Sequence, residues 1–169
     1  MSEGSPGAVA NAKVEHHHRS DGETTFALAT LPSLIMAIAI VLAGAAKARA
    51  EDRVEPYRAE REAYITGFRV SGVHDPAPLA RLQHDLRSLV EATSGAVQAR
   101  ALLELGSVQR LSNEFPQAVS TLTRAAELAT RLGSSEVAFE AWIEVARAHI
   151  IGTHDHGAAQ AAMDHVSST

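Results

Sequence analysis

Four histidines and one aspartate near the C-terminus form the densest group of potential metal ligands. They are His149, His154, Asp155, His156 and His165. Imidazole nitrogens and a carboxylate are an adequate ligand set for zinc, and a hairpin turn would bring His149 towards His156. The alternative is that the histidines are solvated and that Asp155 is the N-cap of the next helix. A small metal-binding enzyme that uses the His149–His165 cluster is therefore one hypothesis for this chain.

The chain lacks the motifs of the common catalytic centres. It has no cysteine, which excludes a disulfide scaffold, a thiolate zinc site, an iron–sulfur cluster and a cysteine nucleophile. It has no G-x-x-x-x-G-K-[ST], no G-x-S-x-G and no H-E-x-x-H, so phosphate-loop, serine-hydrolase and zincin chemistry lack support. We therefore expect a protein that is not an enzyme, with no catalytic residue, no metal and no cofactor.

Composition favours helices and argues against a nucleic-acid binder. The 169 residues include 15 Lys and Arg against 20 Asp and Glu, a formal net charge of −5. Residues 1–50 hold four basic and four acidic residues, so the whole excess belongs to residues 51–169, with 11 basic and 16 acidic residues. Only seven residues are aromatic, whereas strands are rich in aromatic and β-branched side chains. We expect an all-α fold and no nucleic acid.

The N-terminal part contains a leader and a long apolar segment. Residues 1–25 show no apolar periodicity, which predicts a disordered leader. Residues 26–46 then run for 21 residues without a charge, and a helix of that length reaches about 30 Å, the thickness of a bilayer core. We expect residues 26–50 to be either a signal peptide or a membrane anchor helix.

The flanking residues leave both interpretations open. The small residues of Ala48-Arg49-Ala50 are typical of a signal-peptidase site, but the apolar run is longer than that of an ordinary signal peptide. The length suits an uncleaved anchor, and basic residues after the segment would keep the C-terminal part in the cytoplasm. A third interpretation is a buried helix of a soluble domain. We expect an exported (periplasmic or secreted) or membrane-anchored protein, with the membrane side open.

Apolar spacing predicts a series of helices after residue 50. The first covers about 54–68 and the second begins near Pro78, and we expect Ser94-Gly95 to end the second. Further helices are expected over 96–112, 115–132, 135–151 and 156–166. Residues 51–95 would then form a degenerate helical hairpin, and 96–132 and 135–169 would form two clearer ones.

The two later hairpins repeat with a period of 40 residues. This shift aligns Val97 with Val137, and Ala101 with Ala141. It also places Leu102 on Trp142. A fixed period of this length is typical of stacked helical hairpins.

Residues 99–132 resemble the tetratricopeptide repeat. Gly106 lies in mid-helix, where glycine costs about 0.5–1 kcal/mol relative to alanine, so we expect a compensating close contact there. The resemblance implies a bacterial exported or membrane-anchored protein of two to three repeats, an α-solenoid of antiparallel hairpins. It also implies these repeat-packing residues: Leu102, Leu105, Gly106, Phe115, Ala118, Leu122, Ala125, Trp142, Val145, Ala146 and Ala158.

The same resemblance implies a partner-binding groove, because the first helix of each hairpin lines a concave face in that family. Three arginines of this face would pair with carboxylates of a peptide. The matching positions here are Arg100, Leu103, Ser107, Arg110, Glu140, Ile143, Arg147 and Ile150.

We therefore expect a non-enzymatic scaffold that binds a partner peptide or protein in this groove, with residues 26–46 in a membrane if they are not cleaved. The last predicted helix carries Ala158, Ala161 and Met163 with no later helix to shield them. This suggests either self-association through the C-terminal hairpin or a truncated regulatory N-terminal part of a larger enzyme or signalling protein.

Overall fold

A computed structural model of the chain describes residues 24–168, including the side chains of all of these except 24–34, 37, 43, 46 and 168. This part of the chain contains helices and no strand, which confirms the all-α expectation. The elements are α1 (Thr24–Ser71), α2 (Pro76–Ala92), α3 (Gly95–Leu111), α4 (Phe115–Arg131), α5 (Ser135–Ala148), a π-helical turn η1 (His149–Thr153) and α6 (His156–Ser168). Nearly all of the expected leader lies outside the described residues.

α1 is longer than the sequence patterns predict. It continues through Ala48-Arg49-Ala50 to Ser71, whereas two separate segments were expected on either side of residue 50. The chain divides into two compact units, Met1–Ile40 and Val41–Thr169, rather than at residue 50. The described part of the first unit is helical, and the account below concerns the second unit.

Left-handed residues set the ends of the repeated helices. Asn113 (φ 63°) lies in the turn that follows α3, and Gly133 (φ 69°) lies in the turn that follows α4. In each turn the next amide closes the helix by donating to a carbonyl five residues back, at 2.9 Å from Glu114 N to Gln109 O and from Ser134 N to Ala129 O. These ends agree with the expected breaks near 112–114 and 133–135.

The turn before α3 differs from the expectation. α2 begins at Pro76, where the Asp75 carboxylate accepts a hydrogen bond from Ala77 N at 3.0 Å. It ends at Ala92 with the extended residue Thr93 as its C-cap, and Gly95 (φ 64°) opens α3 instead of closing α2.

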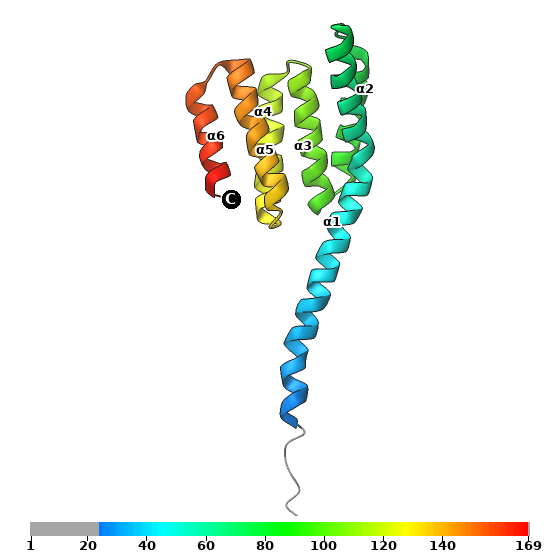
Figure 1. The fold of residues 1–169 in the computed structure, drawn as a ribbon, viewed down its shortest axis with the longest axis vertical. Helices are drawn as coiled ribbons and strands as arrows, with labels where there is room; N and C mark the ends of the chain where they lie inside the picture. Colours follow the sequence, from blue (N-terminus) through cyan, green and yellow to red (C-terminus); the bar gives the residue numbers. More distant parts are fainter. Residues whose placement is uncertain (1–23, 169) are drawn as a thin grey trace, which may run out of the picture. The chain divides into compact units, whose positions relative to one another are not determined.

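In the second unit, α2 to α6 form a row in which each helix packs against the next along the chain, and α3 also packs against α5 (Figure 1). Small side chains let these helices approach closely, as at Gly106, where a Cβ would lie 2.5 Å from Leu122 Cγ. The main core is rich in alanine: Ala99, Leu102, Leu103, Ala118, Leu122, Ala125, Ala126, Ala129, Val137, Ala138, Ala141, Val145, Ala146, Ala159 and Ala162.

A second apolar cluster joins α1 to the row. Leu79, Leu82 and Leu86 of α2 pack with Leu105 and Val108 of α3. Tyr57 and Tyr64 of α1 pack against this cluster from the side, while Ala50 and Val54 are buried. The degenerate hairpin expected over 51–95 thus corresponds to the C-terminal part of α1 and to α2.

The end of α5 departs from a regular α-helix. Residues 149–153, expected to continue the helix to 151, form the π-helical turn η1. Gly152 in this turn lies directly against the Phe115 ring, so that no Cβ could be added there. His154 follows in the left-handed conformation, and Asp155 accepts a hydrogen bond from Ala158 N at 2.9 Å at the start of α6.

Candidate functional site

The predicted groove residues lie on α3, α5 and η1, and five of the eight line one hollow. This hollow, called the groove below, has a volume of about 280 Å³. The five predicted residues in it are Leu103, Ser107, Glu140, Ile143 and Arg147. Arg58, Arg61, Glu62, Glu104 and Glu144, which were not predicted, complete its lining.

The N-terminal end of this face is covered rather than open. Arg100, Leu103 and Ser107 keep only 6%, 3% and 0% of their surface exposed. Beside them α1 contributes Glu51 and Val54. These three positions are buried because the chain's own α1 lies against α3, and Leu103 and Ser107 still belong to the lining of the groove.

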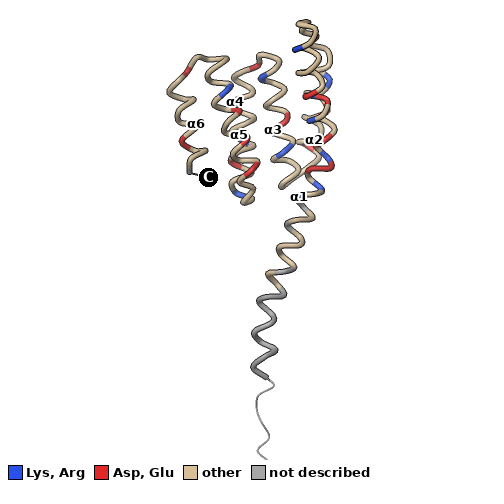
Figure 2. The backbone as a smooth tube through the Cα atoms, viewed as in Figure 1, with Lys and Arg blue, Asp and Glu red and all other residues tan. Residues whose placement is uncertain are grey.

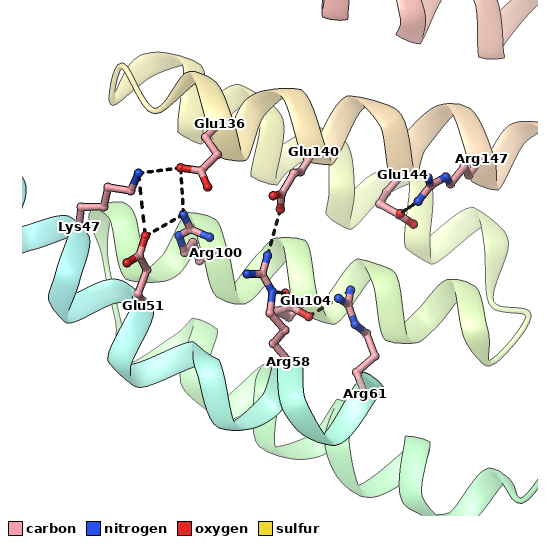
Figure 3. A network of polar contacts seen from close by, with 10 residues as sticks. All are labelled: Lys47, Glu51, Arg58, Arg61, Arg100, Glu104, Glu136, Glu140, Glu144 and Arg147. Carbon is pink, nitrogen blue, oxygen red and sulfur yellow. Dashed lines mark hydrogen bonds and ion pairs between the residues drawn. The ribbon is translucent and has the colours of Figure 1, made fainter. Parts of the chain in front are cut away.

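A charged network links α1 to α3 and α5 (Figure 3). Arg58 bridges two helices, with its Nε 3.4 Å from Glu104 Oε1 of α3 and its Nη2 3.2 Å from Glu140 Oε2 of α5. Lys47 Nζ lies 2.7 Å from Glu136 Oε2 of α5. Basic and acidic positions occur along α1, α3 and α5 (Figure 2). Through the ion pairs given above, α1 contacts both later helices of the face.

Glu104 is the buried centre of the network. It is 3% exposed, and its Oε2 lies 3.2 Å from Arg61 Nη1. This pair is misaligned for a hydrogen bond, so Oε2 has an ionic partner but no hydrogen-bond donor. Burial raises the pKa of Glu104, and the positive charges of Arg61 and Arg58 oppose this increase without cancelling it.

The Lys47–Glu136 pair at the other end of the network is exposed, and here the pKa of the glutamate is lowered instead of raised. The hydrogen bond from Lys47 lowers the pKa of Glu136, with Arg100 adding to the effect. The same hydrogen bond raises the pKa of Lys47. Both side chains are more than half exposed, so solvent and salt screen this pair strongly.

The three arginines expected to hold a partner's carboxylates already contact carboxylates of this chain. Arg100 Nη2 lies 3.2 Å from Glu51 Oε1 and 3.5 Å from Glu136 Oε2. Arg110 Nε donates to Glu144 Oε2 at 2.8 Å, and Arg147 pairs with the other oxygen of Glu144. An acidic peptide would have to displace these carboxylates, which argues against the acidic partner favoured by the sequence.

Several buried polar atoms around α3 have no hydrogen-bond partner. They are Arg61 Nε and Tyr64 Oη on α1, and Glu104 Oε2, Ser107 Oγ and Gln109 Oε1 on α3. A buried polar group without a partner costs about 1–3 kcal/mol. The α1–α3 contact is therefore well packed by its apolar residues but incompletely satisfied by its polar ones.

Two histidines of the predicted metal cluster make other contacts. His165 stacks on Trp142 with ring centroids 4.2 Å apart, and His149 Nδ1 lies 3.2 Å from Thr153 Oγ1. Within residues 24–168, as far as their side chains are described, no group of three or more potential ligands is arranged to hold a metal ion.

Trp142 lies at a second hollow. This one, of about 560 Å³, is lined by Glu127, Thr130 and Arg131 of α4, by the turn at Gly133 and by the Trp142–His165 stack. The indole also packs against the main core. Its position agrees with an inter-helix packing role.

Comparisons with known proteins add no identification. No protein-family model, curated protein or solved structure matches the chain. Within the residues whose side chains the structure describes, no helix is both long and apolar enough to cross a membrane.

The predicted site did not include α1, which contributes Arg58 and Arg61 to the groove. Arg58 and Arg61 are three residues apart and follow Val54 at helical spacing, so they share its face. That spacing was the available signal. The repeat positions of the tetratricopeptide resemblance assign no role to these two arginines.

Proposed function

We propose that this chain is a non-enzymatic interaction module, a tetratricopeptide-like α-solenoid that binds a partner protein or peptide in the groove. One observation carries the proposal. Residues from two successive hairpins, with Leu103 and Ser107 from α3 and Glu140 and Ile143 from α5, meet in a single hollow of mixed apolar and charged lining. Such a surface suits recognition of an extended or helical segment.

The repeated architecture supports this function. Closely packed, alanine-rich helices make a rigid support, and the Gly106–Leu122 contact holds α3 and α4 together. Rigid supports lose little entropy on binding, so a modest groove is sufficient for a specific partner.

The apolar residues 26–46 support a further part of the proposal, namely an exported or membrane-anchored location. In that setting the module would bind its partner outside the cytoplasm or at a membrane surface. A second copy that docks on the C-terminal hairpin belongs to the same proposal, because Met163 of α6 is 40% exposed.

Site-specific photo-crosslinking tests the binding function. A photoreactive amino acid replaces half-buried Ile143 in the groove or, as the matched control, exposed Arg124 on the outer helix α4. We expect a discrete crosslinked partner from position 143 and none from position 124. Equal crosslinking from both positions would contradict a groove-specific function.

A further inference from the structure

We propose that residues 47–64 of α1, called the cover below, are an internal ligand of the α3–α5 face, and that the partner which displaces them is a basic amphipathic helix. This inference rests on the proposed function and names the partner of the same site. Four observations carry it: the charges with which the cover meets the face, its unsatisfied polar contacts, a proline in its middle and the occupied arginines of the groove.

The cover shows which chemistry the face accepts. Its apolar side is formed by Ala50 and Val54, both buried, and by Tyr57 and Tyr64, which pack against the α2–α3 cluster. Three of its cations, Lys47, Arg58 and Arg61, meet carboxylates of α3 and α5. In one pair the charges are reversed, because the carboxylate of Glu51 on the cover contacts Arg100 of α3. The face therefore holds a helix that presents apolar and aromatic residues and, beside them, mostly basic ones.

The cover is held by contacts that another helix could replace. Arg61 Nε and Tyr64 Oη have no hydrogen-bond partner, and neither do Glu104 Oε2 and Ser107 Oγ beneath them. The ion pairs that connect the cover to α5 involve partly exposed side chains, which water and salt weaken. A helix that kept the ion pairs of Glu104 and also formed hydrogen bonds with Glu104 Oε2 and Ser107 Oγ would bind this face better than the cover does.

A proline further weakens the cover. Pro56 lies inside α1, between Val54 and Arg58, and is exposed. Proline in a helix interior has no N–H to donate and its ring clashes with the preceding turn. The cover therefore contains a weak point in the middle of its docked length.

The ion pairs of the three predicted groove arginines indicate the charge of the partner. Arg110 and Arg147 are both paired with Glu144, and Arg100 contacts Glu51 and Glu136. When the cover leaves, Glu104 and Glu140 lose their basic partners on α1. The uncovered face then carries unpaired carboxylates, which attract a basic helix and not an acidic one.

Binding of a labelled peptide tests the proposal on the full chain. The probe is a fluorescent synthetic peptide of residues 47–65, whose affinity is measured by anisotropy. We expect Arg58→Glu with Arg61→Glu in the chain to weaken the cover and to tighten peptide binding at least 10-fold over the wild type. The matched control, Arg53→Glu, changes an exposed arginine of the same helix and should bind as the wild type does.

Two further variants address folding and specificity. Val54→Ala weakens the packing of the cover with every charge in place, and should tighten binding about 3-fold or more even if the double charge reversal fails to fold. Glu140→Lys, added to Val54→Ala, should reverse that gain. Equal affinity of wild type, Val54→Ala and Arg53→Glu would overturn the proposal.

Two other results separate this inference from its alternatives. Light scattering of the chain alone should give a mass that the peptide leaves unchanged, whereas a dimer whose formation the peptide blocks would assign the face to a second copy and overturn the proposal. If position 143 still crosslinks to a partner while the peptide binds no variant, the inference fails and the proposed binding function stands.

Discussion

Glu104 is the residue whose ionisation depends most strongly on burial in the charged network. Because folding raises its pKa, the folded chain holds a proton at this site more tightly than the unfolded chain does. Its contribution to stability is therefore fully present below the ordinary glutamate pKa of about 4.3 and is lost as the pH rises from there through the raised value.

Glu104→Gln removes this pH dependence. We expect the Tm of the variant, relative to that of the wild type, to increase between pH 4 and pH 7, as measured by thermal unfolding at several pH values. A difference that is constant with pH, or that changes in the opposite direction, would show that burial does not dominate at Glu104.

Glu136→Gln serves as the contrasting case at the exposed end. The lowered pKa of Glu136 gives stability that is present above the ordinary value and lost as the pH falls through the lowered one. The Tm of this variant relative to the wild type should therefore increase as the pH falls below about 4.3. Its response should also weaken in high salt, since Lys47 and Glu136 are exposed.

At the scale of the helices, Gly106 fixes the distance between α3 and α4. Gly106→Leu should lower the free energy of unfolding by about 1–3 kcal/mol or more, because its side chain would collide with Leu122. Gly67→Ala in α1 is the matched control, since nothing lies within 4 Å of its added Cβ, and it should be neutral or stabilising by up to about 1 kcal/mol. Chemical denaturation measures both, and an unchanged stability of Gly106→Leu would contradict the close contact.

Helix boundaries could be predicted where local chemistry decides them. Turn residues such as Asn113 and Gly133 stop α3 and α4 because they adopt positive φ, and both breaks were visible in the sequence. The π-helical turn at Gly152 could not be predicted, since it depends on the Phe115 ring from a different helix. The unbroken α1 was also missed, because the change in composition near residue 50 indicated two separate segments.

At the scale of the second unit, α1 lies across α3 and α5 and covers part of the face that these two helices form. The resemblance to the tetratricopeptide repeat indicated five of the ten residues that line the groove, all of them on α3 and α5. It did not show that the first helix lies over them, because long-range ion pairs such as Arg58 with Glu140 leave no periodic signal. The covered face is the central claim, since both the binding function and the basic partner depend on it.

A zero-length crosslink tests that claim most directly. The chain has two lysines, Lys13 and Lys47, and Lys47 Nζ lies 2.7 Å from Glu136 Oε2. Carbodiimide treatment of the full chain followed by mass spectrometry should therefore give an intramolecular Lys47–Glu136 amide, which Lys47→Arg abolishes. If Lys47 is joined only to carboxylates of its own helix, such as Glu51, α1 does not lie across α5 and the covered face must be rejected.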